Sequence, residues 1–129
     1  MSHKLSNLFV RPTDKIKTVL KRLSSGKLKN PHLPPGVALV VDGNNKLLGI
    51  VTNGDIRRAF EADITVDQPI SKAMNKNPSV IKQSERSGDL LPLIFNKMKE
   101  GKWPKDRLER ILVVDDANHV LDMVSFYDL

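Results

Sequence analysis

Two kinds of residue are scarce in this sequence of 129 residues: cysteine is absent, and aromatic residues make up only 5% of the chain. Without cysteine, the chain can form neither disulfides nor thiolate metal sites, which agrees with a cytoplasmic location. The few aromatic side chains do not interleave with the basic runs, so the sequence indicates no stacking platform for nucleic-acid bases.

Long apolar stretches are also missing. The longest unbroken apolar run is Val37–Val41, whereas a membrane-spanning helix needs about 20 apolar residues. The N-terminus lacks the apolar segment of a secretory signal. We therefore predict a protein without a membrane partner.

No catalytic motif is visible. The histidines His3, His32 and His119 are isolated and share no metal-ligand spacing. The sequence has no phosphate-binding glycine loop, no dinucleotide-binding G-x-G-x-x-G and no nucleophilic G-x-S-x-G motif. We predict that this chain is not an enzyme, that it requires no cofactor or metal, and that any catalytic domain lies beyond Leu129.

The chain is basic, with 21 Lys and Arg against 15 Asp and Glu and a net charge of +6. Such a balance can attract nucleic acid or another anionic partner. The lysines are scattered, however, chiefly over 15–29 and 97–105. We interpret them as a solvated surface and predict no nucleic-acid partner. The hydrophobic fraction of 40% suffices for one compact domain or for two half-size units.

What the sequence does contain is an internal repeat. Residues 38–56 (ALVVDGNNKLLGIVTNGDI) and 111–129 (ILVVDDANHVLDMVSFYDL) are identical at 8 of 19 positions when aligned 73 residues apart. About one identity would arise by chance, so the repeat indicates two copies of one supersecondary unit. Any site that the unit builds should therefore occur twice.

Each copy predicts a β-hairpin followed by the start of a helix. In the first copy, Ala38–Val41 and Leu47–Val51 are short β-branched apolar runs, and Asp42–Asn45 between them contains the Gly and Asn of a tight turn. Because both runs are apolar at nearly every position, we expect a sheet that is covered on both faces. Asp115–Asn118 takes the place of the turn in the second copy.

An amphipathic helix is predicted before each hairpin. Apolar residues recur at helical spacing from Ile16 to Leu23 and again from Leu90 to Met98. Pro92 is tolerated only in a first turn, so the second of these helices should start near Asp89. The other predicted elements are strands at Leu8–Val10 and Ser79–Ile81, loops at Ser24–Gly36 and Gly101–Arg110, a helix from Ile56 and a brief helix over Ile70–Met74.

The predicted fold class is α+β, with two β-α-β-β-α repeats that form one pseudo-two-fold module. We assign residues 8–62 to the first repeat, 63–78 to a linker with a short helix, and 79–129 to the second repeat. The second copy stops where its closing helix should begin. We therefore expect the sequence to be a piece of a longer protein.

The segment Thr52-Asn53-Gly54-Asp55 at the start of a predicted helix has two interpretations. As a capping box, Thr52 and Asp55 would satisfy each other's backbone N–H groups. As a ligand site, the N–H groups and the hydroxyl would receive a phosphate, while the carboxylate would accept from two ribose hydroxyls. The spacing favours neither. The second copy repeats the hydroxyl and the carboxylate as Ser125 and Asp128.

The arrangement V-V-D-x-x-x-x-L-x-G-I-V-T-x-x-D-I, doubled within one short chain, resembles the tandem CBS (cystathionine β-synthase) domain pair, or Bateman module. The resemblance covers nearly all of residues 8–129. It is stronger in the first copy, because Asp122 replaces the usual glycine in the second. The strings GIVTNGDIRRAF (49–60) and PISKAMNKNP (69–78) look most like pairs attached to bacterial sugar-nucleotidyltransferases. They are also similar to pairs attached to sugar-phosphate isomerases.

The resemblance implies roles for single residues. Thr52 and Ser125 would contact phosphate, and Asp55 and Asp128 would hold ribose. Four segments would border the base: Val10–Thr13, Ile81–Ser84, Val37-Ala38 and Arg110-Ile111. The predicted ligand-binding residues are Val10, Ala38, Thr52, Asp55, Arg57, Arg58, Ile81, Ile111, Ser125 and Asp128.

Arg57 and Arg58 in this set are our own addition, because the first turns of the helix could place either near a phosphate. For each arginine a solvated helix face is the alternative. Asp122 puts a side chain where the second site would need bare backbone, so we expect that site to be the weaker one.

These expectations define a regulatory module that senses an adenine nucleotide (AMP, ADP or ATP) and controls an attached catalytic domain, a sugar-nucleotidyltransferase. The alternatives are a module of a sugar-phosphate isomerase and a purely structural dimerisation module without ligand. The resemblance implies a homodimer with two-fold symmetry. We also expect this assembly because Phe60, Ile70 and Met74 lie in segments with little local core to cover them.

Overall fold

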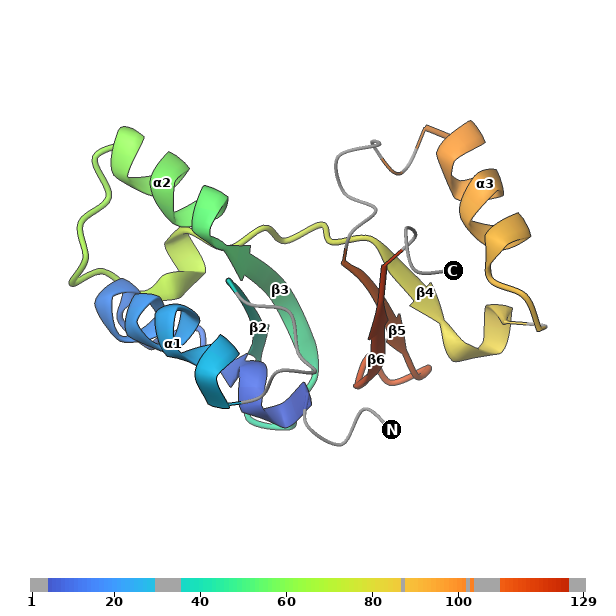
Figure 1. Ribbon diagram of the computed structural model, residues 1–129, viewed down its shortest axis with the longest axis horizontal. Helices are drawn as coiled ribbons and strands as arrows, with labels where there is room; N and C mark the ends of the chain where they lie inside the picture. The colour runs from blue at the N-terminus through green and yellow to red at the C-terminus, as the bar shows by residue number, and fades with distance from the viewer. Residues whose placement is uncertain (1–4, 30–35, 87, 102, 104–109, 126–129) are drawn as a thin grey trace. The chain divides into compact units, whose positions relative to one another are not determined.

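The computed structural model describes residues 5–29, 36–86, 88–101, 103 and 110–125. Its contacts divide the chain into two compact units, of which the first ends at Asn77 and the second begins at Pro78. Each unit contains a three-stranded sheet with helical segments, which confirms the predicted α+β class (Figure 1). Residues 63–77, predicted as a linker, belong to the first unit, and the limits predicted for the two repeats stay a prediction.

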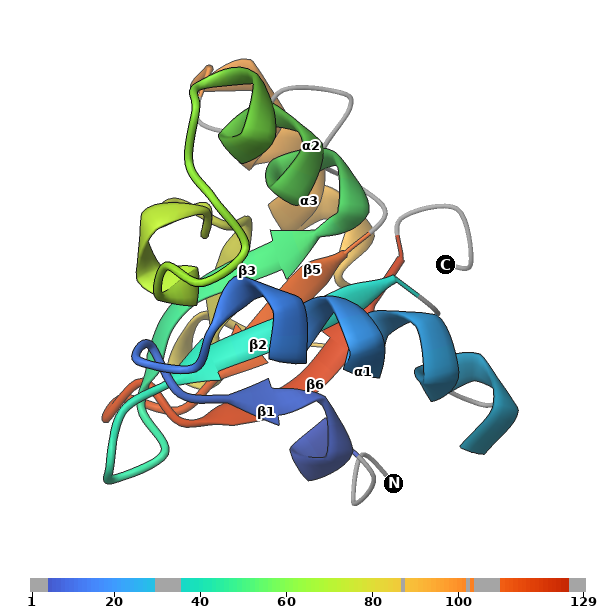
Figure 2. The ribbon, with the colours of Figure 1, turned by 90° about the vertical axis from the view of Figure 1, so that its left-hand side faces the viewer.

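The first unit is built on a sheet of order β1-β2-β3, in which β1 is parallel to β2 and β2 is antiparallel to β3. Helix α1 runs across one face of this sheet, and α2 follows β3 directly (Figures 1 and 2). The elements are η1 (Leu5–Leu8), β1 (Phe9–Val10), α1 (Ile16–Lys29), β2 (Val37–Val41), β3 (Leu47–Thr52), α2 (Asn53–Glu61) and η2 (Ile70–Lys72).

The core of the first unit lies between the sheet and its helices. It is made of apolar side chains from every element of the unit except η1: Val10, Ile16, Val19, Leu23, Ala38, Val40, Val51, Ile56 and Ile70. The helical spacing of Ile16, Val19 and Leu23 and the two-residue spacing of Ala38 and Val40 place these side chains on facing surfaces. The amphipathic pattern that predicted α1 is therefore the pattern that the core uses.

The segment around η2 folds back on the start of α1. The Ile70 N–H donates to the Asp14 carbonyl (2.7 Å), and the Ile16 N–H donates to the Gln68 carbonyl (2.9 Å). As a result Ile70 is fully buried and Met74 packs against the same core. Our expectation that these two residues lack local cover is wrong, because backbone pairing between distant segments supplies it.

The second unit repeats the sheet with order β4-β5-β6. Its elements are β4 (Val80–Lys82), η3 (Gln83–Glu85), α3 (Leu91–Lys99), β5 (Ile111–Val114) and β6 (Val120–Val124). A core cluster here contains Ile81, Leu90, Ile94, Trp103 and Ile111. Trp103 lies in a segment predicted as a loop, most of which is outside the described residues.

The two hairpins share one register. Ala38 pairs with Val51 as Ile111 pairs with Val124, and the register shifts between Val40 and Val41 as it does between Val113 and Val114. The internal repeat is therefore a repeat of structure, because the β2–β3 and β5–β6 pairs share even the same register shift.

The turns of the two hairpins match as well. The Oδ1 atoms of Asp42 and Asp115 accept from backbone N–H groups two and four residues later, at 2.8 and 3.0 Å for Asp42 and 2.9 and 2.8 Å for Asp115. Asn45 and Asn118 adopt positive φ of 63° and 70°. Asp115-Asp116-Ala117-Asn118, although it lacks glycine, thus forms the same turn, because the residue in the left-handed region is asparagine in both copies.

Two predicted boundaries differ from the structure. Helix α1 continues to Lys29, past the loop predicted from Ser24, because the apolar stripe ends before the helical backbone does. Helix α3 begins at Leu91, whose N–H is accepted by Asp89 Oδ1 (3.0 Å), so Asp89 precedes the helix. Pro92 lies in the first turn, as its missing N–H requires.

Candidate ligand site

The candidate site of the first unit lies where β3 passes into α2 without a loop. Thr52 is both the last residue of β3, paired with Val37, and the N-cap of α2, with an extended backbone (φ −122°, ψ 171°). The first N–H groups of a helix have no partner within it. The β3–α2 junction therefore presents helix N–H groups beside a hydroxyl and a carboxylate.

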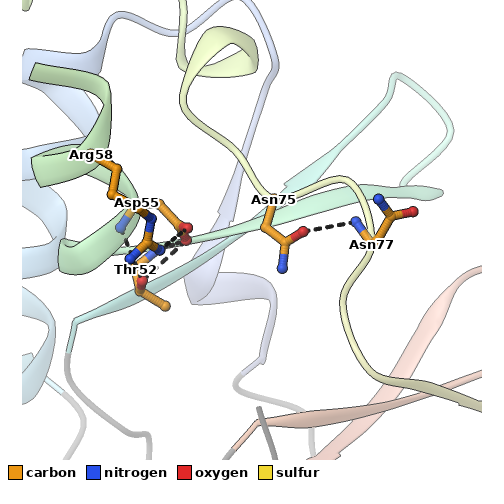
Figure 3. Close-up of polar contacts among 5 residues, drawn as sticks. All are labelled: Thr52, Asp55, Arg58, Asn75 and Asn77. Atoms are coloured by element: carbon orange, nitrogen blue, oxygen red, sulfur yellow. Dashed lines mark hydrogen bonds and ion pairs between the residues drawn. The ribbon is translucent and has the colours of Figure 1, made fainter. Parts of the chain in front are cut away.

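Thr52 and Asp55 form a complete capping box (Figure 3). The Asp55 N–H donates to Thr52 Oγ1 (3.3 Å), and the Thr52 N–H donates to Asp55 Oδ2 (2.9 Å). The Thr52 hydroxyl also donates to Asp55 Oδ2 (3.0 Å). Of the two interpretations that the spacing left open, the capping box is present, and the ligand interpretation stays a prediction.

The other carboxylate oxygen of Asp55 is held by an arginine. Arg58 Nη2 donates to Asp55 Oδ1 at 2.6 Å (Figure 3). The side chain of Arg58 is 61% exposed and that of Asp55 only 12%. Of the two predicted arginines it is thus Arg58 that reaches the carboxylate, whereas Arg57 is exposed on the helix.

Gly49 allows a distant part of the chain to lie against β3 close to the junction. This part, Met74–Asn75, pairs with β3 at Ile50 and is called the crossing segment below. The Ile50 N–H donates to the Asn75 carbonyl (3.0 Å), and the Asn75 N–H donates back to the Ile50 carbonyl (2.8 Å). A Cβ at position 49 would lie 2.7 Å from the Asn75 carbonyl oxygen and 3.0 Å from Met74 Sδ. Our sequence reasoning missed this crossing, and a glycine inside a strand pattern is the signal that could have indicated it.

The crossing segment is itself fixed by a side chain. Asn75 Oδ1 accepts from the Asn77 N–H (2.9 Å), as Figure 3 shows. Asn75 is thus joined to β3 through its backbone and to the last residue of the first unit through its side chain.

A second glycine approaches the first turn of α2. Gly36 has a φ of +74°, and a Cβ there would lie 3.0 Å from Asn53 Nδ2. The left-handed φ and the close neighbour both favour glycine at this position. Gly36, directly before β2, therefore lies against the first residue of α2.

The residues predicted to border a base are core residues. Val10 and Ala38 are buried in the core of the first unit, and Ile81 and Ile111 in that of the second. Since their side chains contact the core, a ligand would meet the backbone of these segments. Ser125 directly follows β6, and Asp128 lies outside the described residues.

The segments after β1 and β4 carry equivalent side-chain caps. The Arg11 N–H donates to Asp14 Oδ2 (2.9 Å), and the Lys82 N–H donates to Glu85 Oε1 (3.0 Å). The Lys82 N–H, together with the Lys97 ammonium 3.1 Å from Glu85 Oε2, holds the pKa of Glu85 below its ordinary value. Two of the four segments predicted to border the base are thus fixed locally by a carboxylate.

Asp122 gives the second unit a different strand edge. The Met123 N–H donates to Asp122 Oδ1 (2.8 Å), whereas its counterpart Ile50 donates to a crossing backbone carbonyl. The aspartate side chain thus supplies the acceptor that the crossing segment supplies at Gly49. This exchange gives a physical reason for the departure from glycine.

Neither a metal site nor a membrane span is found in the described part of the chain. No three His, Asp or Glu side chains there are placed to hold a metal ion. None of its helices has the length and apolar character needed to cross a membrane.

A repeated β-α-β-β unit, with a hydroxyl and a carboxylate where a strand passes into a helix, defines a tandem-repeat module of the α+β class. Residues 1–62 match the family model described as the CBS domain. The structure resembles a CBS domain protein from Pyrobaculum aerophilum complexed with AMP, with a TM-score of 0.66 and 18% identity over 95% of this chain and 82% of that one. The chain thus contains a CBS domain in residues 1–62 and has the fold of a CBS-domain pair.

Two further proteins extend the comparison. The chain is 33% identical over 121 residues to arabinose 5-phosphate isomerase KdsD of Francisella tularensis subsp. tularensis. The aligned region covers 93% of this chain and 32% of the isomerase. The CBS domain pair of protein MJ0100 in complex with 5′-methylthioadenosine and S-adenosyl-L-methionine has a TM-score of 0.66 and 20% identity, over 94% of this chain and 82% of that one.

The chain spans about a third of the length of the curated relatives that it matches first. Arabinose 5-phosphate isomerases recur among these relatives. These relatives do not support our prediction that the chain is most similar to modules attached to sugar-nucleotidyltransferases. The alternative, a module of a sugar-phosphate isomerase, agrees better with them.

Proposed function

We propose that this chain is a non-catalytic regulatory module that binds an adenosyl ligand, such as AMP, ADP or ATP, and controls the catalytic domain of a sugar-phosphate isomerase. The observation that carries the proposal is the β3–α2 junction, where Thr52, Asp55 and Arg58 gather around the start of a helix. The 33% identity with an arabinose 5-phosphate isomerase supports the choice of enzyme.

The chemistry of the junction suits a nucleotide. A phosphate at the start of α2 would meet unpaired N–H groups and the positive end of the helix dipole. The Asp55 carboxylate is an acceptor for the two hydroxyls of a ribose. Two proteins with the same fold are described in complex with AMP, and with 5′-methylthioadenosine and S-adenosyl-L-methionine, which supports an adenosyl ligand.

Regulation would follow from differential affinity. A ligand that binds one arrangement of the full-length protein more tightly than another shifts the population toward it, by no more than the difference in binding free energy. An adenosyl ligand at this junction would therefore couple to an attached active site without any catalytic group of its own.

One observation favours a second candidate, the structural dimerisation module. The capping box is complete without any ligand, so Thr52 and Asp55 already have a reason to be present. In that case the chain would bind no nucleotide.

Calorimetric titration of the chain with AMP, ADP, ATP and S-adenosyl-L-methionine separates the two candidates. If the junction is a ligand site, at least one of these ligands binds, Asp55→Ala abolishes most of the affinity, and Asp55→Asn loses less because the amide oxygen still accepts. If the junction is only a cap, none of them binds, and Asp55→Ala costs about 1 kcal/mol of stability. The second result would overturn the proposed function.

A further inference from the structure

The acceptor capacity of Asp55 is nearly used up within the chain. A carboxylate offers about four lone-pair sites. Three are occupied: Oδ2 accepts from the N–H and the hydroxyl of Thr52, and Oδ1 accepts from Arg58 Nη2. The two hydroxyls of a ribose would need two acceptor sites. A ribose can therefore bind with both hydroxyls only if one of the existing donors leaves.

Arg58 is the donor that leaves most easily. The bond from the Thr52 N–H is half of the capping box, and losing it would weaken the cap of α2. The Thr52 hydroxyl is held beside the carboxylate, because its oxygen accepts from the Asp55 N–H. The Arg58 side chain is 61% exposed, and its ion pair with Asp55 spans three residues on a helix surface. Exposed pairs of this kind contribute little to stability. Displacement of Arg58 thus costs less than displacement of Thr52.

The displaced guanidinium would remain beside the first turn of α2. Its Nη1 and Nη2 atoms lie 3.4 and 3.6 Å from the position that a Cβ of Gly54 would occupy. Because Gly54 has no side chain, the guanidinium can lie directly against the backbone of the first turn. A phosphate bound there would meet a planar charged donor that suits it.

We propose that Arg58 is an exchangeable partner of Asp55, which leaves the carboxylate for the ligand phosphate when an adenosyl ligand binds. Arg58 then determines specificity: it opposes ligands that bring only the ribose and favours ligands that also bring a phosphate. The inference rests on the proposed function, because it assigns the start of α2 to the phosphate and Asp55 to the ribose.

The test compares AMP with adenosine by calorimetry on the whole chain. In Arg58→Ala the competitor is gone, so adenosine should bind about two- to fivefold more tightly. The affinity for AMP should rise by the same factor, because the competitor is gone for AMP too. It should also fall about tenfold or more, because the phosphate loses a charge-assisted bond. AMP should therefore bind more weakly than it does to the wild type, and the preference for AMP over adenosine should fall about tenfold.

Two further variants serve as controls. Arg57→Ala removes the same charge one residue away and measures the general effect of charge on α2. Arg58→Lys keeps the charge but loses the planar fork, so it should retain part of the preference for AMP. Unfolding midpoints of all variants check that the fold is intact.

The outcomes separate the inference from the proposed function. If the wild type binds neither adenosine nor any of the four ligands titrated above, both are overturned. If it binds AMP, but Arg58→Ala changes both affinities by the same factor or acts no differently from Arg57→Ala, the inference alone is overturned. Opposite shifts for adenosine and AMP, specific to position 58, support it.

Discussion

Gly49 is the residue at which the first unit admits the crossing segment, Met74–Asn75, beside its edge strand β3. The crossing is held by two backbone hydrogen bonds between Ile50 and Asn75. Any side chain at position 49 would stand 2.7 Å from the Asn75 carbonyl oxygen, which is part of a backbone and cannot turn away. The bare backbone at this position is thus a steric requirement of the fold.

Gly49→Ala should therefore destabilise the chain by about 1–3 kcal/mol, the usual cost of forcing an extra methyl group into a packed site. Gly43→Ala is the matched control, because a Cβ at Gly43 would meet nothing within 4 Å, and it should change the stability by about 0.5 kcal/mol or less. Urea unfolding measures both. Equal effects of the two substitutions would contradict the role of the crossing segment.

At the same scale, the sequence predicted part of the site. The spacing of Thr52 and Asp55 indicates a capping box, and the structure contains one. The choice between Arg57 and Arg58 was left open, although the three-residue separation of Asp55 and Arg58 places them on one side of a helix. The approach of Gly36 to Asn53 could not be predicted, because it joins segments that are distant in sequence.

The hairpin turns are the elements that acid should affect. Backbone N–H groups, foremost those of Lys46 and His119, hold the pKa values of Asp42 and Asp115 below their ordinary value of 3.8. The folded state then binds these protons more weakly than the unfolded chain. The stabilisation is complete above that ordinary value and is lost as the pH falls through the lower pKa of the folded state.

The double variant Asp42→Asn/Asp115→Asn should test this dependence. An amide oxygen can accept the same backbone bonds, but it carries no charge. We expect the variant to be less stable than the wild type at neutral pH, and the difference to vanish as the pH falls below the folded-state pKa values. Urea unfolding from pH 7 downward measures it. A difference that stays constant over this range would contradict the role of the two charges.

Elements were predictable where the pattern is local. The hairpins were predicted because β-branched runs and asparagine-containing turns are set by neighbours in sequence. Trp103 was assigned to a loop and Ile70 to a segment without cover, yet both are buried in a core. Their burial depends on segments far along the chain, such as the pairing of residues 14–16 with 68–70, which periodicity does not report.

At the scale of the molecule, the two units share the same hairpin, but they differ in what the last strand of that hairpin, β3 or β6, bonds to. The first unit receives a crossing backbone at Gly49, and the second supplies its own acceptor from Asp122. Two copies of one unit thus present different surroundings to a ligand. This difference agrees with our expectation that the second site is the weaker one, which stays a prediction.

The predicted homodimer also belongs to this scale, and two exposed aromatic side chains give it a physical basis. Phe60 on α2 is 40% exposed and Phe95 on α3 is 51% exposed. Large aromatic residues on a surface are typical of interfaces, where they contribute much of the binding energy. A two-fold contact would bury each of them twice, once from each copy.

We therefore expect the chain to sediment as a dimer, and Phe60→Ser to weaken the association at least about tenfold, since each truncated aromatic anchor of an interface costs about 2 kcal/mol or more. Val66→Ser is the control, because Val66 is an equally exposed apolar residue (39%) that lies outside a helix. Equilibrium sedimentation over rising protein concentration measures the association of all three proteins. A wild type that stays monomeric at the highest concentration removes the dimer. A dimer that Val66→Ser weakens as much as Phe60→Ser would instead place the contact away from α2.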